Sequence, residues 1–85
     1  MRMYEIFNLC LHCPSMVNPN AYRDVKMVLT EHVEDCESTY TLEYNSESYN
    51  EKGKLIKTEQ ALHIYDSLED AKEHWQSHVM IETML

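Results

Sequence analysis

Basic residues are scarce in this chain. Its 85 residues include 7 Lys and Arg against 15 Asp and Glu, which gives a formal net charge of −8 with neutral histidines. Direct nucleic-acid binding needs a basic patch that neutralises phosphates, so this composition argues against it. The same balance suits a protein partner with a basic surface, because opposite potentials speed and orient docking. A simpler interpretation is that the negative charge only keeps a small protein soluble.

Glycine and long apolar runs are also nearly absent. Gly53 is the only glycine, so no glycine-rich loop can cradle a phosphate, and no nucleophile elbow or H-E-x-x-H motif is present. We therefore expect a protein that is not an enzyme. No stretch approaches the roughly 20 apolar residues of a membrane span, and the first residues lack a signal-peptide pattern. These absences predict a cytoplasmic protein with no membrane partner.

The three cysteines are an odd number, which does not suit a disulfide framework. A chain of this length buries only about 60–65% of its unfolded surface, so we expect a single domain, residues 1–85, with a thin margin of stability. A structural metal, a protein partner or self-association as a homodimer would each add to that margin.

The hydrophobic pattern predicts the element order β-α-β-β-α. Residues 2–11 carry apolar side chains on both faces, which is typical of a central strand. Residues 38–45 alternate as a strand with one wet face, and a hairpin turn around Asn50–Gly53 leads into an extended segment, 55–65. A C-terminal helix follows, with Ser67 and Asp70 as a start that resembles a capping box.

A further helix is predicted over residues 19–36. Asn18 is a favourable N-cap, and Pro19 suits the first helical position. One face of this helix would carry side chains that recur at helical spacing: Tyr22, Val25, Leu29, His32, Val33 and Cys36. The fold class expected is therefore α+β, with a three- or four-stranded, mainly antiparallel sheet and two helices packed on it.

The pattern C-x2-C-x18-H-x3-C is the first candidate site. Cys10 lies at the end of the first expected strand and Cys13 follows it, while His32 and Cys36 are four residues apart and would share one helix face. Four nitrogen and sulfur donors suit tetrahedral zinc, which would be a structural cofactor rather than a catalyst. The alternative is that the cysteines are core residues and that His32 lies at the edge of the core.

Two other interpretations of the C-x2-C pair stay open. His74 and His78 form H-x3-H on one face of the C-terminal helix, so they are rivals for completing a zinc site. The pair would instead be a redox dithiol if a helix N-terminus lowered the pKa of one thiol. Pro14 follows the pair and the expected helix begins several residues later, which argues against that activation.

Acidic and tyrosine side chains gather between residues 31 and 47. Anions at the C-terminus of a helix cost roughly 0.3–1 kcal/mol each, and a local rule broken without compensation often marks function. Tyrosine is enriched at protein interfaces. We therefore predict a partner-binding surface, with a merely solvated negative face as the alternative. Its residues are Glu31, Glu34, Asp35, Glu37, Tyr40, Glu43, Tyr44 and Glu47.

These observations predict a small acidic, non-enzymatic protein that binds a protein partner and inhibits or modulates it. In size and acidity the chain resembles the stand-alone inhibitors that phages and mobile elements encode, a likeness of composition alone. Its carboxylates would occupy a basic surface, including one that normally holds nucleic acid. The alternatives are a zinc-stabilised adaptor module and a small redox or metal-handling protein.

Overall fold

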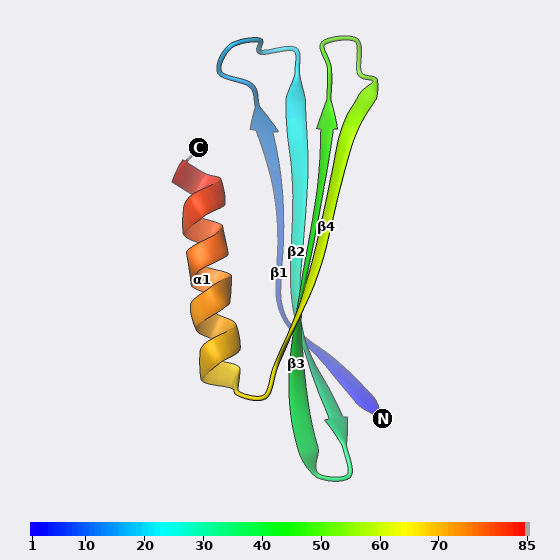
Figure 1. Cartoon of the computed structure of the whole chain (residues 1–85), viewed down its shortest axis with the longest axis vertical. Helices are drawn as coiled ribbons and strands as arrows, with labels where there is room; N and C mark the ends of the chain where they lie inside the picture. Colours follow the sequence, from blue (N-terminus) through cyan, green and yellow to red (C-terminus); the bar gives the residue numbers. More distant parts are fainter. Residues whose placement is uncertain (85) are drawn as a thin grey trace.

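The computed structural model describes residues 1–84, which form four strands and one helix. In chain order these are β1 (Arg2–Pro14), β2 (Tyr22–Glu34), β3 (Glu37–Tyr49), β4 (Leu55–Tyr65) and α1 (Leu68–Met84). The strands form one antiparallel sheet in the order β1-β2-β3-β4, so each pairs with its neighbour along the chain (Figure 1). The molecule is elongated, with principal extents of 49 × 23 × 15 Å.

The expected β-α-β-β-α fold with two helices is wrong, because residues 22–34 form strand β2 and not a helix. Val25, Met27 and Leu29 are buried in this strand, while Lys26 between them is exposed. Val25 and Leu29 are four residues apart, which is close to one helical repeat but also equals two strand repeats. Met27, halfway between them, is also buried, and burial of every second residue is the period of a strand and not of a helix.

The signals that predicted the start of a helix form a turn instead. The Ala21 N–H donates to the Asn18 carbonyl at 3.0 Å, and the Asn20 N–H donates to the Asn18 side chain at 3.2 Å. Pro19 thus occupies the second position of a β-turn, which its fixed φ also favours. Asn-Pro suits a helix start and a turn equally. Only the hydrophobic pattern of the residues that follow can distinguish between the two.

Strand β1 lies at an edge of the sheet and is not the covered central strand expected from its apolar residues. Its register with β2 shifts between Glu5 and Phe7. Ile6 packs against the core, and Phe7 stacks on Trp75 of the helix with ring centroids 5.4 Å apart. Because of this bulge, the adjacent residues Ile6 and Phe7 both contact the covered side of the sheet. The apolar residues of β1 therefore looked in the sequence as if they lay on both faces of a regular strand.

The other expected elements are present. Residues 38–45 lie within β3, and residues 55–65 form β4. The Asn50 carbonyl closes the hairpin between them by accepting from the Gly53 N–H at 2.9 Å, and Gly53 has a φ of 78°, which glycine adopts without strain. The helix begins after Ser67, whose hydroxyl accepts from the Asp70 N–H at 3.5 Å.

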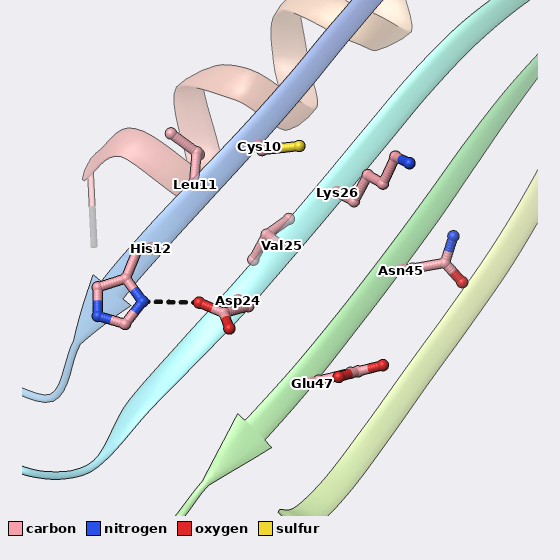
Figure 2. A pocket seen from close by; sticks show the side chains of 8 residues that line it. All are labelled: Cys10, Leu11, His12, Asp24, Val25, Lys26, Asn45 and Glu47. Atoms are coloured by element: carbon pink, nitrogen blue, oxygen red, sulfur yellow. Dashed lines mark hydrogen bonds and ion pairs between the residues drawn. The ribbon is translucent and has the colours of Figure 1, made fainter.

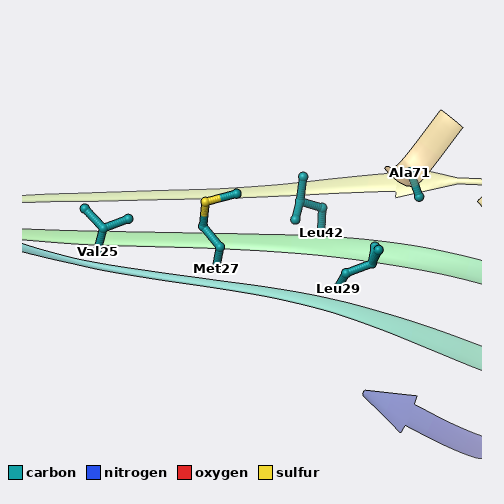
Figure 3. Close-up of a cluster of buried hydrophobic side chains, with 5 residues drawn as sticks. All are labelled: Val25, Met27, Leu29, Leu42 and Ala71. Atoms are coloured by element: carbon teal, nitrogen blue, oxygen red, sulfur yellow. The ribbon is translucent and has the colours of Figure 1, made fainter. Parts of the chain in front are cut away.

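The core lies between α1 and one face of the sheet. Its buried hydrophobic side chains come from β2, β3 and the helix: Val25, Met27, Leu29, Leu42 and Ala71 (Figure 3). Trp75 and Val79 pack against this cluster from later turns of α1. Within residues 1–84, no helix has the length and apolar character that crossing a membrane requires.

Candidate functional site

One face of the sheet is left uncovered by the helix, which lies to one side of the strands in Figure 1. Because α1 packs over Val25, Met27 and Leu29, the residues that alternate with them point to the opposite side. We call this side the open face. Its charged and aromatic residues along the first three strands include His12, Tyr22, Asp24, Lys26, Glu43, Glu47 and Tyr49.

Three rings line up across the open face, one from each of the first three strands. His12 and Tyr22 have ring centroids 4.8 Å apart, and Tyr22 stacks on Tyr49, also at 4.8 Å. Strand register produces this order, since Tyr22 lies directly opposite Tyr49 on β3. We call these three residues the aromatic row. Rings packed together in this way present a large, stiff contact area of the kind that anchors protein interfaces.

Carboxylates border the aromatic row. Asp24 and Glu47 lie opposite each other on β2 and β3, where like charges destabilise a sheet. Each has a partner in the row, since His12 Nδ1 is 2.7 Å from Asp24 Oδ1 and the Tyr49 hydroxyl donates to Glu47. The hydrogen bond to Glu47, followed by desolvation, raises the pKa of Tyr49 to about 12.

A depression in the surface adjoins these carboxylates (Figure 2). It is lined by Cys10, Leu11, His12, Asp24, Val25, Lys26, Asn45 and Glu47. In Figure 2, Cys10, Lys26 and Asn45 extend to the same side from three adjacent strands. Among the described strand residues, Lys26 is the only Lys or Arg on the open face. The surplus of acceptor oxygens suits a lysine or arginine side chain.

The residues predicted to bind a partner divide between the two faces of the sheet. Glu31, Tyr40 and Tyr44 share the face that α1 covers, and the Tyr40 hydroxyl donates to Glu31 Oε2 at 3.1 Å. Desolvation, with this hydrogen bond as the next cause, raises the pKa of Tyr40. Glu43 and Glu47 are exposed on the open face. Glu47 borders the aromatic row, whereas Glu43 lies further along β3 on the same face, six residues from Tyr49.

The remaining predicted residues form the β2–β3 hairpin, at the bottom of Figure 1, and not a helix end. Glu34 pairs with Glu37, and Asp35 and Cys36 between them have φ values of 50° and 66°. The helix-dipole argument for these carboxylates is therefore wrong. Like-charge repulsion across the hairpin remains, since the two glutamates are direct neighbours with Asp35 beside them.

The structure does not bring together the four residues of the predicted zinc site: Cys10, Cys13, His32 and Cys36. His32 and Cys36 do not share a helix face, because this segment is a strand followed by a turn. His32 Nε2 is 2.8 Å from Thr41 Oγ1. His32 also lies six residues along β2 from Lys26, the neighbour of Cys10, and six strand residues span about 20 Å.

The two thiols of the C-x2-C pair are also separated. Strand β1 continues through both residues, so Cys10 points to the open face and Cys13 to the covered one. Residues three apart in a strand have Cα atoms about 10 Å from each other, whereas a disulfide needs less than about 7 Å. Redox cycling between these thiols would require β1 to rearrange.

Metal binding by this chain stays a prediction. Within residues 1–84, no group of three or more His, Cys, Asp or Glu side chains is already disposed to hold an ion. His74 and His78, the rival pair, lie beside His63 of β4, at the edge of the sheet opposite β1 and its cysteines. Metal analysis of the purified protein is the direct test.

The sequence did not single out His12, Tyr22 and Asp24, although a signal was present. Tyr22, Asp24 and Lys26 alternate with the buried residues of β2, and this alternation was masked by the assignment of a helix. No protein family, no curated protein and no solved structure matches the chain. The geometry of the open face is therefore what bears on the function of this chain.

Proposed function

We propose that this chain is a small acidic, non-enzymatic protein that binds a protein partner through the open face and thereby inhibits or modulates it. The observation that carries the proposal is the aromatic row, His12, Tyr22 and Tyr49, bordered by Asp24 and Glu47 on a face without a helix. Protein interfaces combine aromatic anchors with a polar rim, and this part of the molecule has both.

Charge favours a partner with a basic surface. The facing carboxylates Asp24 and Glu47 repel each other in the free protein, and a lysine or arginine placed between them would relieve that repulsion. Glu43 extends the negative charge along β3 on the same face. The net charge of −8 would also accelerate encounter with a basic surface.

Charge reversal on the open face tests the proposal. A partner captured from a cell lysate on the immobilised parent would be identified and purified, and its Kd measured for the parent and for Glu43→Lys with Glu47→Lys. The matched control is Glu69→Lys with Glu73→Lys, which changes the net charge by the same amount at exposed positions of α1. We expect the open-face variant to bind roughly tenfold more weakly or worse, and the control to stay near the parent.

Equal loss in both variants would mean that only net charge matters, and unchanged binding by the open-face variant would contradict the site. Added salt gives a second readout, because exposed charges are screened over roughly 8–10 Å near physiological ionic strength. If the partner's basic surface normally holds nucleic acid, an added duplex will displace this chain. If the duplex and the chain bind the partner at the same time, the chain must occupy a surface of the partner other than the one that holds nucleic acid.

A further inference from the structure

Three of the five histidines gather where α1 lies against β4. His63 comes from β4, whereas His74 and His78 are four residues apart on the helix and therefore share a face. The ring centroids are 6.0 Å apart for His63 and His74, and 6.1 Å apart for each of the other two pairs. We call these residues the histidine triangle. It lies on the covered side of the sheet, so the partner-binding open face does not use it.

We propose that the histidine triangle binds a divalent transition cation of the zinc type. Imidazole nitrogens are preferred ligands of such ions. Tetrahedral zinc with Zn–N bonds of about 2.0–2.1 Å would hold the ring centroids about 5.3 Å apart. The observed separations of 6.0 and 6.1 Å exceed this by roughly 0.8 Å, which side-chain rotation can close without moving the backbone.

The surroundings of the triangle allow this closure. His63 and His74 are exposed and His78 is half-buried, so a shift of the His63 and His78 rings toward His74, which Tyr65 holds in place, would leave the buried core undisturbed. The ring nitrogens do not yet converge on one point, in keeping with the absence of a preformed ligand group within residues 1–84. The proposal is therefore that the ion draws together three rings that the fold already places in reach.

Tyrosines support two of the three rings from outside. The Tyr65 hydroxyl is hydrogen-bonded to His74 Nδ1, which leaves Nε2 as the nitrogen available to a metal. Histidines that bind metals commonly have their second nitrogen tied to such a partner, which fixes both tautomer and orientation. The ring of Tyr44 lies 6.1 Å from that of His78. Tyr65 and Tyr44 thus contact two of the three histidines on the side away from the proposed ion.

A bound ion would join β4 to the helix. Every position of β4 except Tyr65 is exposed, so this strand is held mainly by its pairing with β3 and contributes few side chains to the core. A cross-link between the two elements would stabilise the folded state by an amount that grows with the logarithm of the free ion concentration once this exceeds the Kd. The fourth position of a tetrahedral ion would be left to solvent or to a side chain of a partner.

Zinc titration of the 85-residue chain tests the proposal. Competition with a chromophoric chelator would give the Kd for Zn²⁺ of the parent, His63→Ala, His74→Ala and the matched control His32→Ala. Loss of an outer-shell partner alone typically weakens a metal site about 10–100-fold, so loss of a ligand should weaken binding at least about tenfold. The control should bind as the parent does. Zinc should raise the thermal midpoint of the parent and of the control, but not of the two triangle variants.

A variant without thiols separates the triangle from a cysteine site. Cys10→Ser, Cys13→Ser and Cys36→Ser in one chain should retain the affinity of the parent for Zn²⁺. Cobalt(II) should give visible bands without a thiolate charge-transfer band. Loss of binding in the thiol-free variant, loss in His32→Ala, or full affinity in His63→Ala would each overturn the proposal.

The variants at His63 are expected to fold, because of where this residue lies. His63 is exposed on an edge strand, so its replacement leaves the core intact. His63→Gln, which keeps a polar side chain that does not replace imidazole as a zinc ligand, provides a second version of the same test. Both should match the circular dichroism spectrum of the metal-free parent, and full zinc affinity in the Gln variant would contradict the triangle as directly as in the Ala variant.

Discussion

The two faces of the sheet are formed by the same strands but differ in role. On the covered face, Val25, Met27 and Leu29 are buried beneath the helix. On the open face, Asp24 and Lys26, their immediate neighbours along β2, are exposed. Alternation along one strand thus supplies a core on one side and a charged surface on the other. The open face can consequently change its chemistry at little cost to folding, whereas the covered face cannot.

The largest expected effect comes from a matched pair of leucines. Leu42 has no exposed surface, while Leu62, on the open side of β4, is 59% exposed. Leu42→Ala should lower the free energy of unfolding by about 2–5 kcal/mol, because it removes packed methyl groups and leaves a cavity. Leu62→Ala should change it by less than about 0.5 kcal/mol.

Urea denaturation of the two variants measures this difference. In a domain this small, Leu42→Ala is expected to leave little folded protein, so Leu42→Val serves as a milder version with a cost of about 1 kcal/mol. Similar costs for the alanine variants at the two positions would mean that α1 does not cover the sheet as described.

A second prediction concerns the backbone conformation of the β2–β3 hairpin and not the side chains of either face. Cys36 has a φ of 66°, a left-handed conformation that costs a residue with a Cβ about 1–2 kcal/mol. Glycine is preferred at the second central position of such a two-residue turn. Cys36→Gly should therefore stabilise the fold by about 1 kcal/mol, which raises the thermal midpoint by about 4–8 °C in a domain of this size.

Cys36→Ser is the matched control, since it removes the thiol but keeps the same backbone demand. Its thermal midpoint should stay close to that of the parent. An equal gain in the serine variant would assign the effect to the thiol, and no gain in the glycine variant would contradict the left-handed turn.

Much of the fold could be predicted from local patterns. β3 alternates cleanly, Asn50–Gly53 carries turn residues, and Ser67 with Asp70 marks a helix start, so each element is specified within its own segment. β2 was not assigned in this way, because Val25 and Leu29 fit helix and strand periodicity alike and the start signals at Asn18 and Pro19 favoured a helix over the local alternation. Its pairing with both neighbours in the sheet, which no local window contains, selects the strand.

The candidate sites were predicted less well, because each depends on register between distant segments. Glu43 and Glu47 were predicted and lie on the open face. The aromatic row needs residues from β1, β2 and β3 in register, and the histidine triangle needs β4 beneath α1. Only the i to i+4 spacing of His74 and His78 was visible beforehand, because it is a property of a single helix.

The smallest expected effect compares a tyrosine on each face. Tyr49, on the open face, has its pKa raised to about 12 chiefly by the hydrogen bond to Glu47. The pKa of Tyr40, on the covered face, is raised chiefly by desolvation, with Glu31 as the lesser cause. Glu47→Gln should therefore lower the pKa of Tyr49 substantially toward the ordinary value of 10.0, while Glu31→Gln should lower that of Tyr40 less.

Stability at alkaline pH follows from the sign of the Tyr49 shift. Below pH 10 the phenol is neutral in both the folded and the unfolded chain, so its contribution is fully present. Between the ordinary pKa of 10.0 and the folded value of about 12, the unfolded chain releases the proton first, so stability falls as pH rises through this window. Carbon-13 NMR titration of the tyrosine Cζ atoms resolves the two residues. Glu31→Gln should not lower the pKa of Tyr40 as far as Glu47→Gln lowers the pKa of Tyr49. Equal changes in the two pKa values would mean that burial does not distinguish the two faces at these positions.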